Sequence, residues 1–301
     1  MNVARAAPSA ALVAAMLALP FVGSEYAVAI GFELLMWIAL TQSWTVLSGM
    51  TGYISLGHAV FYGLGAYFVV LTYGTVPLWL SLPLAGLLNL LFATAVSLPV
   101  LRVRGPYFVI LTFGLSELVK YVVLAVEAAL GEFGRMVFGV PGVIALYWIM
   151  LALAVAATVL VELVRRTRFG QGLLAIREEE TAAEAMGIPV VRYKMLAYGL
   201  SAIIPGMVGG VMALRTTYFE PQAAFDPIVS FTILTMAIIG GSDDARGPVL
   251  GTAFLTLLSE LLWARAPEIY LIILGVALIA FVLLLPQGIC GWLFPPRRPA
   301  T

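Results

Sequence analysis

Apolar residues run through nearly the whole chain in stretches of about twenty, separated by short polar turns. About 20 apolar residues cross the hydrocarbon core of a bilayer as a helix, so each stretch predicts one transmembrane helix. We therefore expect an all-α polytopic membrane protein with about ten transmembrane helices, although eight or nine also fit the pattern. The expected helices cover residues 8–23, 26–47, 53–74, 77–101, 106–129, 141–164, 195–214, 227–241, 249–264 and 268–292.

One long hydrophilic segment, residues 165–194, interrupts this pattern. Within it, Ala182, Ala183 and Gly187 have a spacing that predicts a short helix with a face of small residues. A face of this kind suits docking into a groove on a partner. We therefore interpret residues 165–194 as a coupling loop inside a single transmembrane domain that covers residues 1–301.

The lysine and arginine residues predict the orientation of the chain, because short cytoplasmic loops carry an excess of both. If the N-terminus is cytoplasmic, the inner loops hold Arg5, Arg102, Arg104, Arg165, Arg166, Arg168, Arg177, Arg192, Lys194, Arg246, Arg297 and Arg298. The outer loops then hold only Arg135, Arg215 and Arg265. We expect both termini and the coupling loop to be cytoplasmic. The first apolar stretch also fits a cleaved secretory signal, which would leave nine helices in the same orientation.

Composition excludes several classes of protein. The chain is 62% hydrophobic and only 11% charged, far from the values of soluble domains. Its net charge of zero offers no basic surface for nucleic acid. A single cysteine, Cys290, and a single histidine, His58, provide neither a disulfide framework nor a set of metal ligands. We therefore expect no enzyme and no cofactor on this chain, and any energy must come from another subunit.

A glycine-rich run between Gly49 and Tyr67 contains the first candidates for a solute pathway. Glycines allow helices to approach closely or the backbone to open, while Ser55 and His58 beside Gly57 supply the few groups that could bond a polar solute. The alternative is structural, with glycines at helix contacts and His58 bonded by a neighbouring helix. The sequence leaves both interpretations open.

Glu117 and Lys120 are three residues apart within an apolar stretch, a spacing at which helical side chains meet. Ionisable groups inside a membrane are candidates for function, and a pair of opposite charges suits a zwitterionic amino acid. Alternatively, the pair neutralises itself and locks helices together. A secondary transporter driven by an ion gradient through Glu117, Lys120 or His58 is the rival functional class.

An ordered series of motifs extends over roughly residues 40–292. It comprises residues 49–59 (GMTGYISLGHA), 63–67 (GLGAY), 101–108 (LRVRGPYF), 111–114 (LTFG), 175–188 (AIREEETAAEAMGI), 240–241 (GG), 247–248 (GP) and 286–288 (PQG). Together these segments resemble the LivM-type permease subunits of the branched-chain amino-acid ABC importers. The part between residues 170 and 194 is the most specific.

The resemblance implies a permease in the bacterial inner membrane that pairs with a homologous LivH-type permease. It also implies two ATP-binding subunits, which use the ATP, and a periplasmic substrate-binding protein. Thr112 joins Ser55, Gly57, His58, Glu117 and Lys120 as a candidate pathway residue. The resemblance assigns coupling to Arg177, Glu178, Glu180, Ala182, Ala183 and Gly187, although Thr181 stands where the general coupling motif has glutamate. The implied solutes are branched-chain or related amino acids, with urea, short amides and aromatic acids as alternatives.

Overall fold

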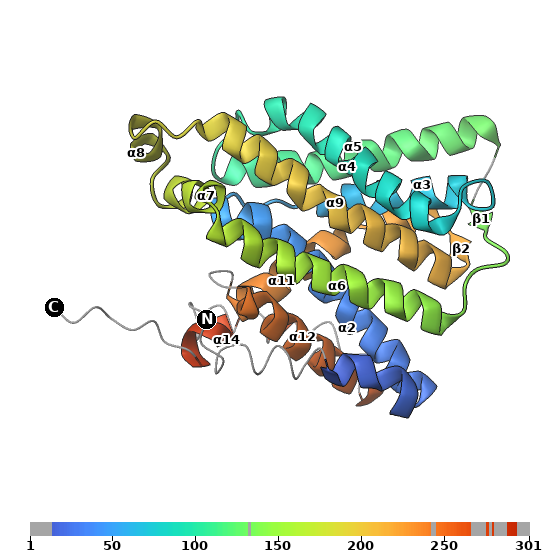
Figure 1. Ribbon diagram of the computed structural model, residues 1–301. Helices are drawn as coiled ribbons and strands as arrows, with labels where there is room; N and C mark the ends of the chain where they lie inside the picture. Colours follow the sequence, from blue (N-terminus) through green and yellow to red (C-terminus); the bar gives the residue numbers. More distant parts are fainter. Residues whose placement is uncertain are drawn as a thin grey trace.

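The computed structural model describes residues 14–131, 134–241 and 245–265, together with 275, 276, 279 and 288–293. Residues 14–22 are helical and turn at Gly23 into the first labelled helix. The elements that follow are α2 (Glu25–Trp44), η1 (Thr45–Gly49), α3 (His58–Thr72), α4 (Leu78–Val100), α5 (Pro106–Leu130), β1 (Arg135–Met136), α6 (Val143–Arg166), α7 (Arg168–Glu178), α8 (Glu180–Ala185), α9 (Val190–Thr216), β2 (Tyr218–Phe219), α10 (Pro221–Ala224), α11 (Pro227–Gly240), α12 (Arg246–Arg265) and α14 (Gly288–Leu293) (Figure 1).

Six helical stretches in the described ranges are long and apolar enough to cross a membrane. They are α2 with η1, α4, α5, α6, α9 and the stretch of α10 and α11, and each coincides with a predicted transmembrane helix. The chain is therefore an all-α polytopic membrane protein, as predicted. Most of the predicted helix 268–292 and the first residues of 8–23 lie outside the described residues, so the count of ten and the side of the termini stay predictions.

Helix α9 lies at the centre of the bundle and packs against α3 and α4 (Figure 1). Its contact with α3 is built on glycines: a Cβ atom at Gly65 would lie 1.9 Å from the carbonyl oxygen of Gly206. A Cβ atom at Gly209 would lie 2.0 Å from the carbonyl oxygen of Tyr62. The two backbones thus approach more closely than side chains would allow, as is common between helices in membranes.

The end of the bundle opposite α7 and α8 is tied together by a two-residue ladder. Strands β1 and β2 pair antiparallel, with Arg135 opposite Phe219. Beside them, the buried carboxylate of Glu127 in α5 accepts hydrogen bonds from the Tyr67 hydroxyl (2.7 Å) and from Arg135 (3.0 Å). The loop after α5 is therefore fixed both to α3 and to the link between α9 and α10.

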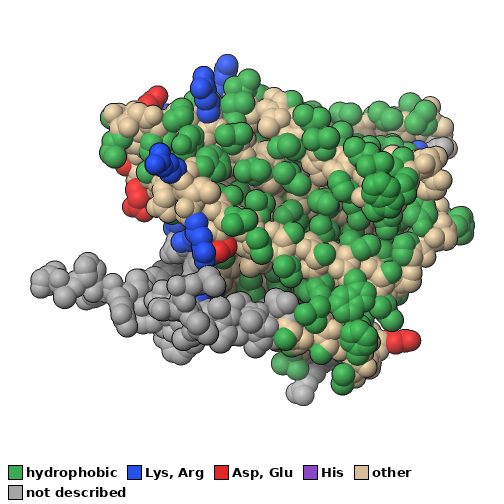
Figure 2. All heavy atoms as spheres, viewed as in Figure 1, with side chains coloured by type: hydrophobic (Ala, Val, Ile, Leu, Met, Phe, Trp, Pro, Cys, Tyr) green, Lys and Arg blue, Asp and Glu red, His purple; other side chains and the backbone are tan. Residues whose placement is uncertain are grey.

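The surface separates into an apolar belt and a charged end. Hydrophobic side chains cover most of the face seen in Figure 2, whereas most of the lysine, arginine and acidic side chains in view gather at the end that carries α7 and α8. An apolar belt suits lipid tails, and a charged end suits water and phospholipid headgroups. The distribution agrees with a chain that crosses a bilayer along the long helices.

Candidate functional site

The predicted coupling loop consists of two short helices between α6 and α9. The Thr167 hydroxyl caps α7 by accepting a hydrogen bond from the amide of Gly170 (3.1 Å). The carboxylate of Glu179 caps α8 by accepting a hydrogen bond from the Thr181 amide (3.4 Å), and it also accepts one from the Thr181 hydroxyl (2.6 Å). After α8 the chain turns at Gly187, where φ is +86°. The short helix expected around Ala182 and Ala183 is present, but residues 190–194 belong to the transmembrane helix α9 rather than to a loop.

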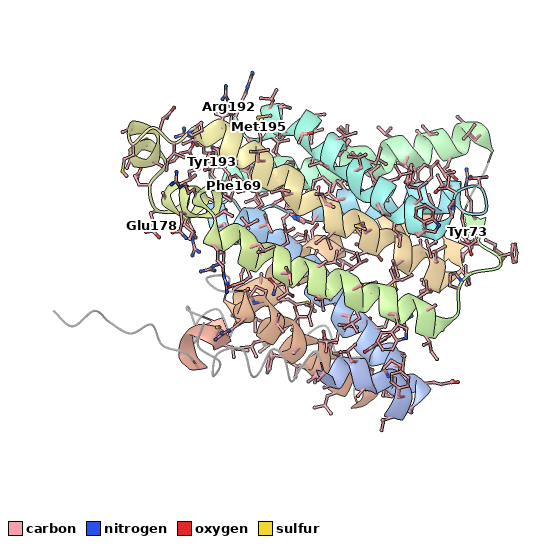
Figure 3. The ribbon with its side chains drawn as sticks, viewed as in Figure 1. Tyr73, Phe169, Glu178, Arg192, Tyr193 and Met195 are labelled. Carbon is pink, nitrogen blue, oxygen red and sulfur yellow. The ribbon has the colours of Figure 1, made fainter. Side chains whose placement is uncertain are left out.

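Helix α8 presents one face to the bundle and one to its surroundings. Ala183 is buried against the bundle, whereas Ala182, Met186 and Gly187 are exposed. Glu178, at the end of α7, and Arg192, at the start of α9, also point outward at this end (Figure 3). The exposed face of α8 and its charged surroundings are therefore accessible to a partner.

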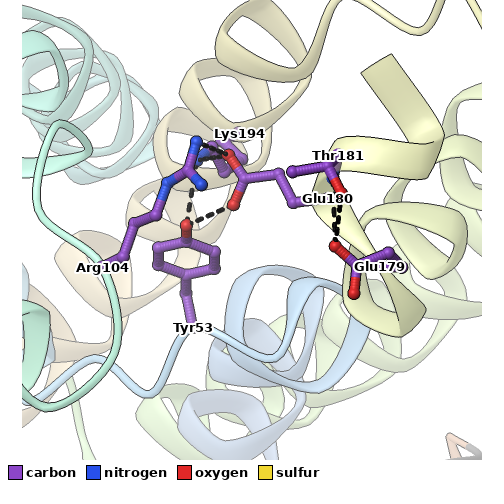
Figure 4. A network of polar contacts seen from close by, with 6 residues as sticks. All are labelled: Tyr53, Arg104, Glu179, Glu180, Thr181 and Lys194. Carbon is purple, nitrogen blue, oxygen red and sulfur yellow. Dashed lines mark hydrogen bonds and ion pairs between the residues drawn. The ribbon is translucent and has the colours of Figure 1, made fainter. Parts of the chain in front are cut away.

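Glu180 at the start of α8 is the centre of a polar network (Figure 4). Its carboxylate accepts hydrogen bonds from the Tyr53 hydroxyl (2.6 Å) and from the Lys194 ammonium group (2.8 Å). The Arg104 guanidinium group lies 3.2 Å away, and Lys194 also donates to the Tyr53 hydroxyl (3.1 Å). One carboxylate thus connects α8 to α9, to the link between α4 and α5, and to the segment before α3.

The network favours the ionised form of Glu180. Burial alone would raise the pKa of this carboxyl group, but the hydrogen bonds from Lys194 and Tyr53 and the charges of Lys194 and Arg104 outweigh it, so the pKa lies below its ordinary value. Burial and the hydrogen bond to Glu180 raise the pKa of the Tyr53 hydroxyl, which therefore stays protonated as a donor. At neutral pH the network holds one negative charge between two positive ones.

Helix α7 reaches the same segment by a second contact. The Arg177 guanidinium group donates a hydrogen bond from Nη1 to the carbonyl oxygen of Gly49 (2.9 Å). Close by, Gly52 has a φ of +76°, a conformation that favours glycine, and a Cβ atom there would lie 3.3 Å from Cγ of Arg177. Both α7 and α8 therefore hold the chain where η1 leads into α3.

Residues 52–57 are not helical, which corrects the prediction of a continuous helix over 53–74. Side chains from other positions bond the backbone of this segment in place of helical partners. The indole of Trp44 donates to the carbonyl oxygen of Ser55 (2.8 Å), and the Ser48 hydroxyl accepts from the Ser55 amide (3.2 Å). Buried backbone groups that lack helical partners need such bonds, because an unpaired buried amide or carbonyl is costly.

Helix α5 supplies further partners of this segment. The Leu56 amide donates to the Thr112 hydroxyl (3.1 Å), and the Ser116 hydroxyl donates to the Leu56 carbonyl oxygen (3.3 Å). From α11, the Ser230 hydroxyl accepts from the amide of Ala59 in the first turn of α3 (2.9 Å). The segment is consequently held by α2, η1 and α5, and α11 holds the start of α3.

The pathway candidates Ser55, Gly57 and His58 lie together at the start of α3, and all three are buried. The Ser55 hydroxyl accepts a hydrogen bond from the Gly57 amide (3.2 Å), and the His58 ring meets the Phe61 ring edge-on at 5.6 Å. Within the described ranges, neither ring nitrogen of His58 nor the hydroxyl of Tyr198 has a hydrogen-bond partner. The structural interpretation expected a neighbouring helix to bond His58, and no such hydrogen bond exists within the described ranges.

Glu117 and Lys120 form the expected pair within α5. The Lys120 ammonium group donates to the Glu117 carboxylate at 2.7 Å, and both side chains are partly exposed. They lie one to two turns beyond Thr112 on the same helix. The parts of the chain that the structure describes contain no group of three or more His, Cys, Asp or Glu side chains placed to hold a metal ion.

Replacement of Thr112 by valine should destabilise the segment without changing its shape. The substitution removes the acceptor for the buried Leu56 amide, which costs about 1–3 kcal/mol when no other partner is available. Denaturant titration of the purified protein in detergent measures the loss. Thr158→Val is the matched control, because its hydroxyl is hydrogen-bonded to the Ala154 carbonyl of its own helix. Equal midpoints for the two variants would show that Thr112 does not support the segment.

The comparisons with known proteins identify the family of this chain. The family described as "Branched-chain amino acid transport system / permease component" matches residues 26–282. The permease protein LivM of the high-affinity branched-chain amino acid transport system of Salmonella typhimurium is 29% identical over 96% of this chain and 75% of its own length, as is LivM of Escherichia coli. A "Probable branched-chain amino acid transport permease protein LivH" from Methanocaldococcus jannaschii is 24% identical over 81% of this chain and 76% of its own length. No solved structure matches. The matched residues include the helices from α3 to α12, the predicted coupling loop and the segment before α3, and the chain belongs to this family of branched-chain amino acid transport permease components.

Proposed function

We propose that this chain is the permease subunit of an ATP-driven importer that carries branched-chain or related amino acids across the bacterial inner membrane. The family match over residues 26–282 and the relatives named for branched-chain amino acid transport support the solute class. The chain moves a solute and makes no covalent bond, and separate subunits bind and hydrolyse the ATP. Its partners are a homologous LivH-type permease, two ATP-binding subunits and a periplasmic substrate-binding protein.

The end of the bundle that carries α7 and α8 faces the cytoplasm in this proposal. The inner loops of the predicted topology hold twelve Lys and Arg residues and the outer loops hold three, and charged side chains gather at this end in Figure 2. Both observations follow the rule that cytoplasmic loops are positively charged. In this proposal the chain has about ten transmembrane helices, and both termini lie inside.

The coupling loop acts on the segment before α3, and the contacts of Glu180 and Arg177 carry this proposal. Glu180 is hydrogen-bonded to Tyr53, and Arg177 is hydrogen-bonded to Gly49. A displacement of α7 and α8 therefore acts directly on both ends of the stretch 49–53, which leads into the segment before α3. The outward-facing Glu178, Ala182 and Gly187 meet the ATP-binding subunits, and Ala183 seats α8 on the bundle. ATP binding then biases two states of the permease because the subunits contact α8 differently in each.

The segment that receives this displacement borders the solute pathway. Ser55, Gly57 and His58 lie where the helical hydrogen bonding is interrupted, and Thr112 holds Leu56 from α5. Interrupted helices near the middle of a membrane commonly form transporter binding sites. The His58 nitrogens, buried and without a partner in the described residues, supply polar atoms of the kind that a pathway needs. Glu117 and Lys120 extend the pathway along α5.

Co-purification with the products of the adjacent genes tests the proposal. The chain should retain two ATP-binding subunits, and ATP hydrolysis in lipid should rise several-fold when the binding protein is added with a branched-chain amino acid. Binding protein without the amino acid is the control. Absence of any ATP-binding subunit would contradict the coupling proposal and favour a transporter driven by an ion gradient.

Gly187→Arg should uncouple the permease while leaving its helices folded. The substitution places a bulky charge on the exposed end of α8 and strains a backbone that has a φ of +86°. We expect at least a tenfold loss of retained ATP-binding subunits or of stimulated hydrolysis. Gly74→Arg is the matched control, because Gly74 has a φ of +84°, is also free of neighbours within 4 Å of an added Cβ and lies at the opposite end. Similar retention by both variants would argue against docking at α8.

A further inference from the structure

The ion pair of Glu117 and Lys120 lies at the middle of a transmembrane helix. Helix α5 begins at Pro106 and ends at Leu130, so at 1.5 Å per residue each member of the pair is about 15 Å from the nearer end. That distance is about half of the 30 Å hydrocarbon core. The two charges therefore lie near the centre of the bilayer rather than in the headgroup region.

The face of α5 that carries the pair is poorly covered by the rest of the chain. Only 17% of the α5 span is buried, the lowest share among the six candidate spans, against 67% for α9. The side chains of Glu117 and Lys120 are 27% and 14% exposed, and Tyr121, one turn beyond Glu117 on the same side of the helix, is 63% exposed. Both charged groups are thus accessible from a surface that would otherwise meet lipid.

Lipid is an unsuitable environment for this surface. Ionised groups at the centre of a bilayer are costly unless they face protein or water, even when they are paired. By contrast, α4 has no charged side chain, and the charged side chains of α6 lie in its last two turns, so the exposed faces of these helices suit lipid tails. The face of α5 thus differs from these surfaces, because it carries charged side chains at the middle of the helix.

The same helix supports the non-helical segment before α3. Thr112 and Ser116 hold Leu56 through hydrogen bonds, and Phe113 packs against Phe231 of α11 with ring centroids 6.1 Å apart. Thr112 and Ser116 are buried, and Ser116 lies one turn before Lys120 on the same side of the helix, so the pair is one turn away from the groups that hold the segment. The permease in this family works with a second permease subunit in the proposed importer, which supplies the opposite wall.

We propose that Glu117 and Lys120 line the translocation path on a face of α5 that closes against the partner permease, and that they exchange their mutual ion pair for the ammonium and carboxylate groups of a zwitterionic solute. This inference rests on the proposed function. A zwitterion can satisfy both charges when it separates them, whereas urea or a short amide carries no charge to replace either one. The pair would then favour amino acids over neutral solutes.

Cysteine accessibility in the assembled importer tests the position of this face. In a Cys290→Ser background, Tyr121→Cys is compared with Leu91→Cys, since Tyr121 is 63% exposed beside the pair, whereas Leu91 is 59% exposed on α4, a helix with no charged residue. A water-soluble cationic methanethiosulfonate should modify the cysteine at position 121 at least tenfold faster, because a thiol reacts as the thiolate in water. Equally slow modification of both, in a complex that still transports amino acids, would overturn the inference and leave the proposed function standing.

Charge variants test the role of the pair in the same reconstituted importer. Glu117→Gln and Lys120→Gln should each lower the transport rate of a branched-chain amino acid at least tenfold while the ATP-binding subunits remain bound. The exchanged variant, Glu117→Lys with Lys120→Glu, restores an ion pair on the helix but reverses the charges that the path presents. We expect it to remain defective. Recovery of transport by the exchanged pair would show that the pair only locks the helix and would overturn the inference.

Discussion

Replacing Glu180 with alanine is expected to destabilise the coupling loop by about 3–5 kcal/mol, because it leaves the Lys194 ammonium group buried without a carboxylate. The Lys194 side chain is only 3% exposed, so water cannot take the place of the lost partner. The Tyr53 hydroxyl also loses its acceptor. The tie between α8 and the segment before α3 should break, so that stimulated ATP hydrolysis and transport fall at least tenfold.

Two measurements and two controls make this result specific. Limited proteolysis of the purified chain should cut between α7 and α9 much faster in Glu180→Ala, and transport in the assembled importer reports the coupling. Glu180→Gln keeps an acceptor for Tyr53 and should be intermediate. Glu162→Gln removes an exposed ion pair with Arg166, which is worth at most about 0.5 kcal/mol, and should behave like the unmodified chain. Unchanged proteolysis and transport in Glu180→Ala would exclude the network from coupling.

Gly65→Ala, which adds a single methyl group at the contact between α3 and α9, should strongly destabilise the protein. The new Cβ atom would lie 1.9 Å from the carbonyl oxygen of Gly206, and a backbone atom cannot rotate away as a flexible side chain can. The helices must separate, and we expect a loss of about 3 kcal/mol or more. The midpoint of thermal unfolding in detergent and the yield of folded protein should both fall.

Gly114→Ala is the matched control for this prediction. Gly114 also lies within a transmembrane helix, but a Cβ atom there would meet nothing within 4 Å. Alanine is the better helix former by up to about 1 kcal/mol, so this variant should be as stable as the unmodified chain or slightly more so. If Gly65→Ala and Gly114→Ala unfolded at the same temperature, the close approach of α3 and α9 would not contribute to stability.

Hydropathy alone was sufficient for the long helices, because each needs only enough apolar residues to cross the bilayer. The predicted helix 77–101, for example, corresponds to α4 (Leu78–Val100). Hydropathy failed at residues 52–57, which carry Ile54 and Leu56 and continue directly into the apolar residues of α3. The reason is that partners of this backbone, Thr112 and Ser116, come from a helix far along the chain. The only local signal was the pair of glycines, Gly52 and Gly57, that bracket the segment.

The coupling residues were predicted from a motif, but their contacts were not. Glu180 and Arg177 were assigned through the resemblance, whereas nothing in the sequence indicated that Tyr53 would bond Glu180 across 127 positions. Arg104 and Lys194 were interpreted only as charges that set the orientation of the chain. A motif records which side chains are needed, while the bundle decides which distant residues meet them.

The short helix α3 also has a consequence for biosynthesis. With fifteen residues it is about 22 Å long, less than the thickness of the hydrocarbon core, and its glycine face is covered by α9. A ribosome completes α4, α5, α6 and the coupling loop before it reaches α9, and the amide of Ala59 receives its partner Ser230 later still. Nascent chains that stop before α9 therefore hold a short helix with an uncovered face, and we expect such fragments to be less stable than chains that include α9.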